Sequence, residues 1–90
     1  REIFRHEGNV AYPKVAPGAP PVFVHRDLQG RDYAPLKTGQ PMFQDLAGRT
    51  WWYEGPETRY PVFINEAAYY YENIAFSLTR RISLASLIAF

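Results

Sequence analysis

The stretch YPVFINEAAYYY, residues 60–71, is the part of the sequence around which the other elements are organised. Tyr60 to Ile64 predict a short buried strand, because the Val-Phe-Ile run at 62–64 is apolar and has high β-propensity. Pro61 has no N–H to donate to a ladder, so it belongs at the first position of this strand or on a sheet edge. The fold should therefore contain a strand here that ends where the polar residues begin.

The apolar run stops at Asn65-Glu66, and three tyrosines follow at 69–71. Three consecutive side chains cannot all point into one core, so at least one hydroxyl should face solvent, a cleft or a partner. Packing of the tyrosines against a β-rich core is the simplest interpretation. The alternative is a binding role, because Glu66 and a phenol three residues later in a non-helical turn can place a hydroxyl beside a ligand carboxylate.

Composition predicts a single small all-β domain. Ninety residues suffice for one domain and not for two. Apolar residues at 47% and aromatic residues at 17% argue against disorder, and eight prolines with six glycines favour many turns over long helices. We expect about six or seven short antiparallel strands with little helix, arranged as a barrel or a sandwich.

The strands are expected in stretches of alternating or apolar residues that turn residues separate. Gly39 and Gly48 supply the two turns in the middle of the chain, and 13–21 is a proline-rich loop. The clearest alternation has apolar side chains at even positions between 74 and 84. The expected strands are Glu2–Tyr12 with a turn or bulge at His6 to Asn9, Pro21–Arg26, one starting at Pro41-Met42-Phe43, Thr50–Tyr53, Tyr60–Ile64 and Ile74–Leu84.

Charge and composition exclude several classes of function. A net charge of +1 with scattered arginines and lysines makes no basic stripe, so nucleic acid is not an expected partner. No apolar run is long enough for a spanning helix, and no membrane partner is expected. The lack of cysteine is compatible with a reducing compartment, and we expect a cytoplasmic protein. The sequence opens without a methionine and directly into a strand, which suggests an excised fragment.

The chain alone lacks the parts of an active site. His6 and His25 fall on different expected strands without a neighbouring histidine or cysteine, so no metal site is expected. No nucleophile motif and no phosphate-binding glycine loop is present. Trp51-Trp52 and the tyrosines at 69–71 are better explained by packing. They leave open a stand-alone interaction module that binds a protein or sugar through exposed aromatic side chains.

The string YPVFINEAAYYYENIAFSLTRRISL resembles the C-terminal domain of the aspartoacylase family, which includes aminoacylase-3. The likeness runs from about residue 12 to 84, nearly the whole chain, and Asn-Glu-Ala-Ala-Tyr-Tyr is its most specific part. The upstream motifs that resemble the same domain, in the same order, are His25-Arg26-Asp27-Leu28-Gln29-Gly30-Arg31-Asp32-Tyr33, Pro35-Leu36, Gly39, Pro41-Met42-Phe43 and Gly48.

This resemblance implies a zinc-dependent amidohydrolase whose catalytic domain precedes residue 1, with residues 1–90 as the C-terminal domain. The zinc ligands, the catalytic glutamate and most substrate-holding arginines of the family lie in that catalytic domain. The fragment alone should then be inactive and zinc-free, and its partners would be the catalytic domain and an N-acyl amino acid. N-acetyl-L-aspartate is the first choice of substrate and aromatic acyl amino acids come second. The oligomeric state is not predicted.

The same resemblance gives roles to two residues of the opening stretch. The family's substrate-binding tyrosine falls on Tyr69, and Glu66 matches a glutamate that shapes the site. In the implied reaction zinc activates the water that attacks the acyl carbonyl, while Tyr69 donates a hydrogen bond to the substrate carboxylate. The chain departs from the family pattern at Trp51-Trp52-Tyr53, at Arg26 and in the tail 85–90, which leaves the identity of the acyl amino acid open.

Overall fold

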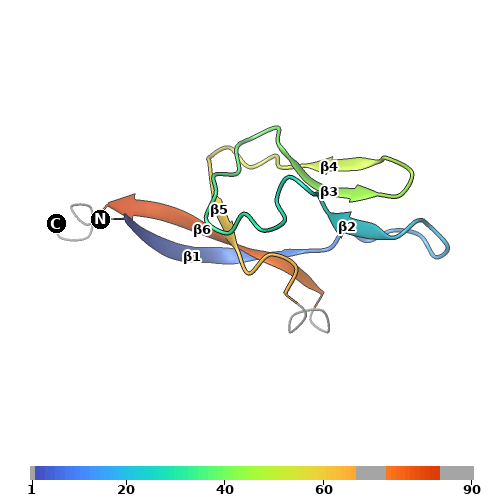
Figure 1. Ribbon diagram of the computed structural model, residues 1–90, viewed down its shortest axis with the longest axis horizontal. Coiled ribbons are helices and arrows are strands. Elements are labelled where there is room, and N and C mark those ends of the chain that lie inside the picture. The colour runs from blue at the N-terminus through green and yellow to red at the C-terminus, as the bar shows by residue number, and fades with distance from the viewer. Residues whose placement is uncertain (1, 67–72, 84–90) are drawn as a thin grey trace.

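The chain forms two small antiparallel sheets, as the computed structural model shows for residues 2–66 and 73–83 (Figure 1). The expected all-β fold is confirmed, and no helix able to cross a membrane occurs in those ranges. One sheet has the order β1-β6-β5 and the other β2-β3-β4. The strands are β1 (Glu2–Ala11), β2 (Val22–Val24), β3 (Pro41–Asp45), β4 (Thr50–Trp52), β5 (Tyr60–Val62) and β6 (Ile74–Ser83).

Strands β1 and β6 come from opposite ends of the chain and pair along their whole length as a long ribbon (Figure 1). Two irregularities interrupt the ladder. Glu7 is the extra residue between the pairs His6↔Thr79 and Gly8↔Leu78, which confirms the bulge expected there. Ala75 is the extra residue on β6, at the end of the ribbon where β1 finishes.

The burial of β6 differs from the simple alternation that its sequence predicts. Phe76 is fully buried as expected, but Ser77 and Thr79 on the opposite face are also buried. Strand β6 is the central strand of its sheet, so strands pair along both of its edges. The Ser77 hydroxyl donates to Asn9 Oδ1 at 2.8 Å and the Thr79 hydroxyl to the Tyr60 carbonyl oxygen at 2.6 Å, which offsets the cost of burial.

The turns of the second sheet lie at the glycines where the sequence predicts them. Gly39 and Gly48 both take positive φ, at 87° and 89°, where glycine carries no steric penalty. In the β3–β4 turn the Asp45 carboxylate accepts the N–H groups of Ala47 and Arg49, each at 2.9 Å. The hairpin predicted from sequence is confirmed, with strands shorter than predicted at β2 and β4.

The prediction of a buried strand through Ile64 is wrong in its last part. Strand β5 ends at Val62, and Phe63 is 48% exposed with φ of +53°. The Phe63 N–H donates to the Asp32 carboxylate at 2.9 Å and not to a neighbouring strand. Because the Asp32 side chain binds this N–H, the chain leaves the sheet at Phe63. Ile64 then packs in the core, whereas Phe63 does not. Pro61 lies on an edge strand, as predicted.

The core lies between the two sheets and draws on both. The ring of Phe43 in β3 stacks on the ring of Phe76 in β6, with centroids 5.8 Å apart. The Tyr12 ring also packs against the Phe43 ring, with centroids 5.7 Å apart. Aromatic pairs of this kind add about 0.5–1.5 kcal/mol to the burial of their area. The buried cluster consists of Val24, Leu28, Leu36, Phe43, Tyr53, Ile64, Ala75 and Phe76.

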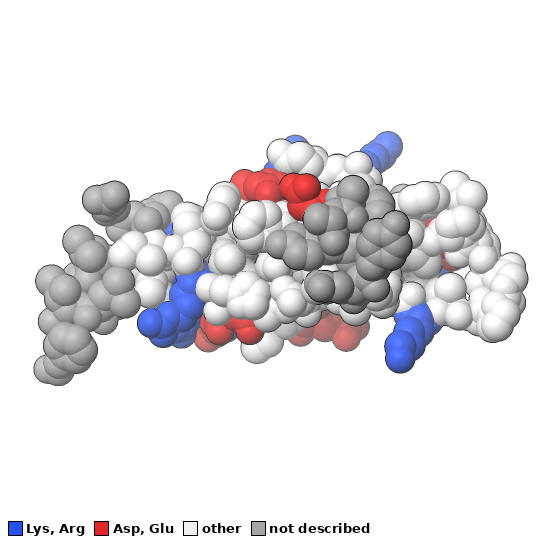
Figure 2. Space-filling model, turned by 90° about the horizontal axis from the view of Figure 1, so that it is seen from below, with Lys and Arg blue, Asp and Glu red and all other residues white. Residues whose placement is uncertain are grey.

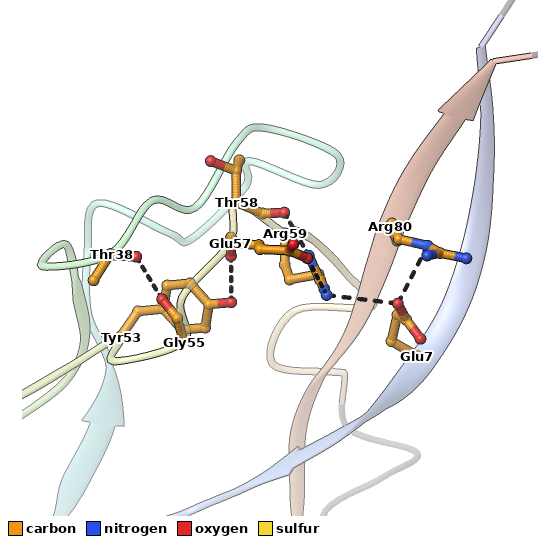
Figure 3. Close-up of polar contacts among 8 residues, drawn as sticks. All are labelled: Glu7, Thr38, Tyr53, Gly55, Glu57, Thr58, Arg59 and Arg80. Atoms are coloured by element: carbon orange, nitrogen blue, oxygen red, sulfur yellow. Dashed lines mark hydrogen bonds and ion pairs between the residues drawn. The ribbon is translucent and has the colours of Figure 1, made fainter.

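A junction of polar contacts joins the two sheets where β4 leads into β5 (Figure 3). Leu36 and Arg59 exchange backbone hydrogen bonds of 2.7 and 3.0 Å. The buried Tyr53 donates its hydroxyl to the Glu57 carbonyl oxygen at 2.6 Å. Gly55 sits directly against this ring, and a Cβ at Gly55 would overlap the ring and its hydroxyl. Only glycine fits at position 55 without movement of a buried side chain.

We expect Gly55→Ala to lower the free energy of unfolding by about 2 kcal/mol, because the added methyl must displace the Tyr53 ring and its hydrogen bond. Urea unfolding followed by tryptophan fluorescence measures this. Gly8→Ala is the matched control, since its Cβ would meet nothing within 4 Å. A Gly55→Ala variant as stable as Gly8→Ala would show that the Tyr53 ring moves without cost.

Candidate functional site

The two residues expected to face a substrate lie at the connection between β5 and β6. Glu66 is exposed and is the last described residue before the gap at 67–72. Tyr69 lies outside the described residues, as do Tyr70 and Tyr71. The site must therefore be built from the residues that hold the two ends of this connection.

Two asparagines bracket the connection, and both adopt the left-handed conformation. Asn65 has φ of +55° and Asn73 has φ of +57°. Asparagine tolerates this region better than most residues, although it still carries some strain. Tyr69 stands four positions after the first asparagine and four before the second. The backbone thus turns sharply at both ends of the segment that carries the predicted substrate tyrosine.

Three hydrogen bonds close the base of this connection. The Asn65 N–H donates to the Ala75 carbonyl oxygen at 2.8 Å, and the Tyr12 N–H donates to the Asn73 carbonyl oxygen at 3.3 Å. The Tyr12 hydroxyl donates to Asn65 Oδ1 at 2.8 Å. We call these four residues, Tyr12, Asn65, Asn73 and Ala75, the asparagine corner. Tyr12 contacts both asparagines and so ties the two ends of the connection to the end of β1.

The asparagine corner rests on the hydrophobic core. Tyr12 is partly buried and its ring packs against Phe43, which is 2% exposed. Ala75 is fully buried and is the bulged residue of β6. A phenol held by its ring in this way brings its hydroxyl to a fixed place. Sequence reasoning missed Tyr12, and the one signal for the corner was the pair of asparagines around the tyrosines.

A second brace lies just before the corner, at the end of β5. The Asp32 carboxylate accepts the Phe63 N–H at 2.9 Å, and the Tyr33 N–H donates to the Pro61 carbonyl oxygen at 2.7 Å. Tyr33 and Phe63 are both about half exposed and both have positive φ. These two hydrogen bonds therefore hold the backbone at Pro61 and Phe63, just before the chain reaches Glu66.

The histidines offer no zinc site. His6 Nε2 lies 3.2 Å from Asn9 Oδ1, and His25 Nδ1 accepts the Asp27 N–H at 3.1 Å, so each is engaged locally and on a different part of the fold. Within residues 2–66 and 73–83 no three histidine, cysteine or acidic side chains gather closely enough to hold a metal ion. The donor set for zinc does not exist in this part of the chain.

Two of the arginines that border one hollow of the surface form ion pairs with glutamates. This hollow of about 430 Å³ is bordered by Arg59, Arg80 and Arg81. Arg59 Nη2 lies 3.1 Å from a Glu57 oxygen and 3.7 Å from Glu7 Oε1, and Arg80 Nε lies 3.4 Å from the same Glu7 oxygen (Figure 3). The bulge at Glu7 directs its carboxylate to both guanidinium groups. These ion pairs link β1 and β6 to the segment that leads into β5.

The two neighbouring tryptophans differ in their burial. Trp51 is partly buried against the core with the Arg49 guanidinium 4.5 Å above its ring, whereas Trp52 is 52% exposed. Acidic and basic side chains are dispersed over the face in Figure 2 and form no continuous basic stripe among the described residues there. The exposed aromatic side chain alone does not define a platform for a sugar or a base.

Comparison with known proteins identifies relatives of the whole fold. The model of the AstE/AspA barrel-sandwich hybrid domain family matches residues 1–81. The chain is 47% identical over 85 residues to an aspartoacylase from Xenopus tropicalis, covering 94% of the chain and 27% of that protein. It is 46% identical over 80 residues to the human N-acyl-aromatic-L-amino acid amidohydrolase (carboxylate-forming), covering 89% and 25%.

A solved structure agrees with these matches. The crystal structure of murine aminoacylase 3 superimposes with a TM-score of 0.83 at 43% identity, covering 91% of this chain and 27% of that one. The chain thus spans about a quarter of the length of the relatives that it matches. Both the fold and the resemblance predicted from the sequence are confirmed.

We expect the 90-residue chain to retain much less than one equivalent of zinc after dialysis, because the described residues lack a set of ligands. Elemental analysis of the dialysed chain measures this. The double variant His6→Gln/His25→Gln serves as the control and should give the same content. One equivalent of zinc in the chain, lost in the double variant, would contradict the prediction.

Proposed function

Since the chain belongs to the AstE/AspA barrel-sandwich hybrid domain family, we propose that it is the C-terminal, substrate-gating domain of a zinc-dependent amidohydrolase that deacylates N-acyl amino acids. The catalytic domain would precede residue 1. The observation that supports this proposal is that nearly the whole chain matches about one quarter of the length of an aspartoacylase and of a related amidohydrolase. One of those proteins is named an aspartoacylase and the other an amidohydrolase of N-acyl aromatic amino acids.

The substrate that we propose first is N-acetyl-L-aspartate, which would yield acetate and aspartate. Relatives named for aspartoacylase and for N-acyl-aromatic amino acid hydrolysis match at 47% and 46% identity, so overall similarity does not choose between the two. N-acyl aromatic amino acids are therefore the alternative substrates. Both classes present a carboxylate next to the acylated nitrogen, which a tyrosine hydroxyl can bind.

Zinc in this proposal belongs to the catalytic domain, because the described part of this chain offers no ligands for it. The chain's own contribution is to bind and orient. Tyr69 would donate a hydrogen bond to the substrate carboxylate, and Glu66 would shape and orient the site beside it. Holding a substrate in the reactive geometry accelerates a reaction without any chemical step by the residue that holds it. Such a protein would act in the cytoplasm.

The test of the proposed function is an assay of the full-length protein with N-acetyl-L-aspartate and N-acetyl-L-tyrosine, together with its zinc content. We expect about one zinc per chain and release of acetate from one of the two substrates. Chelation should abolish activity, and added zinc should restore it. The 90 residues alone should release no acetate. A full-length protein that hydrolyses neither substrate with zinc bound would contradict the proposal.

We expect Tyr69→Phe in the full-length enzyme to lower kcat/KM by the equivalent of about 1–3 kcal/mol, because one hydrogen bond to a charged group is lost. Steady-state kinetics on the preferred substrate measure this. Tyr70→Phe is the matched control, since it removes a neighbouring hydroxyl to which we assign packing only. Equal kinetics for the two variants would remove Tyr69 from the site.

A further inference from the structure

We infer that a hollow beside β4 binds an arginine side chain from an extended segment of another protein. The hollow has a volume of about 360 Å³, and most of the residues that border it are apolar, among them Val10, Pro13 and Met42. Trp52 and Glu54 also border it. The inference goes beyond the proposed function, because it uses none of the residues to which that function assigns a role.

The first step is the direction of the Trp52 and Glu54 side chains. Trp52 ends β4, and Glu54 follows two positions later. Tyr53 between them is buried, and its N–H donates to the Gln40 carbonyl oxygen at 2.8 Å. Successive side chains of an extended chain point to opposite sides. Because Tyr53 points into the core, Trp52 and Glu54 point outward on the same side.

The second step is the charge of the hollow. Of the described residues that border it, Glu54 alone is charged. Glu7 and Glu57 form ion pairs with Arg59, whereas Glu54 forms no ion pair in the part of the chain that the structure describes. An unpaired carboxylate at the border of an apolar hollow favours a ligand that carries a positive charge at the end of an apolar stem.

The third step is the indole ring of Trp52. This side chain is 52% exposed, although tryptophan is highly buried in most proteins. The neighbouring Trp51 ring has the Arg49 guanidinium 4.5 Å from its centroid, and no cation of the described residues lies over the Trp52 ring. The Trp52 ring can therefore bind a guanidinium from another molecule in the way that Trp51 binds Arg49.

An arginine side chain fits these three features together. Its methylene groups can pack against the apolar border of the hollow. Its planar guanidinium can stack on the Trp52 ring while two of its N–H groups donate to the oxygens of Glu54. A lysine ammonium cannot donate to a carboxylate in this paired geometry, and an aliphatic side chain would leave the Glu54 carboxylate without a partner.

The test is a titration of the full-length protein with the peptide acetyl-Ala-Gly-Arg-Gly-Ala-amide. NMR of the indole N–H signals of Trp51 and Trp52 measures the dissociation constant at the hollow itself. Matched peptides with lysine or leucine in place of arginine are titrated in parallel. We expect the arginine peptide to bind about threefold more tightly than the lysine peptide and about tenfold more tightly than the leucine peptide.

Variants of the two outward side chains should weaken the binding of the arginine peptide. We expect Glu54→Gln to raise its Kd about threefold to tenfold and to leave the Kd of the leucine peptide unchanged. Trp52→Leu should raise the Kd of the arginine peptide about twofold to thirtyfold, as read from the Trp51 signal.

Two control variants match these changes away from the hollow. Phe23→Leu removes another exposed aromatic ring, since Phe23 is 47% exposed and does not border the hollow. Glu57→Gln removes the same charge as Glu54→Gln at a carboxylate that also lies outside the hollow. Both controls should bind the arginine peptide as the unaltered protein does.

The competing occupants give different results. Equal affinity for the arginine and leucine peptides would overturn the inference in favour of an apolar segment. Equal affinity for the arginine and lysine peptides would show that the hollow does not recognise a guanidinium, and an arginine peptide that shifts neither indole signal would exclude binding there. Should Trp52→Leu fail to fold, Glu54→Gln decides, because an arginine preference that survives it would contradict the role of this carboxylate.

Discussion

Pairing of β1 with β6 is the constraint on which the rest of the structure depends. It joins the two ends of the described chain over the full length of both strands, from Glu2↔Ser83 to Ala11↔Ile74. Strand β6 thereby becomes the centre of its sheet, and Phe76 is directed onto Phe43 of the other sheet. The same pairing brings Tyr12, the residue after β1, next to the connection that precedes β6. The core and the candidate site both follow from one ladder.

The two irregularities in that ladder have different consequences because they lie at different places. At Glu7 the extra residue turns a carboxylate toward Arg59 and Arg80, which links the ribbon to the junction before β5. Exposed ion pairs are individually weak, so the linkage gives orientation more than stability. At Ala75 the extra residue is buried, and its carbonyl oxygen accepts the Asn65 N–H. Bulges commonly redirect the chain beside functional sites, and this one forms the floor of the asparagine corner.

Local patterns in the sequence were sufficient to predict the fold class, the turns at Gly39 and Gly48, and the bulge between His6 and Asn9. These features depend on backbone preferences of neighbouring residues. The exposure of Phe63 could not be predicted, because it results from Asp32, a carboxylate from a distant segment that captures the Phe63 N–H. The contact of Tyr12 with Asn65 was missed for the same reason, since only tertiary structure brings position 12 to position 65. Glu66 and Tyr69 were identified through resemblance and not through chemistry visible in the chain.

Hydrogen bonds at the asparagine corner hold two strained backbone positions at the surface of this domain. The left-handed turns at Asn65 and Asn73 are costly for non-glycine residues, and local hydrogen bonds to Tyr12 and Ala75 hold them in place. Packing of Tyr12 against the core that contains Phe43 and Phe76 thus helps to fix a backbone conformation at the surface.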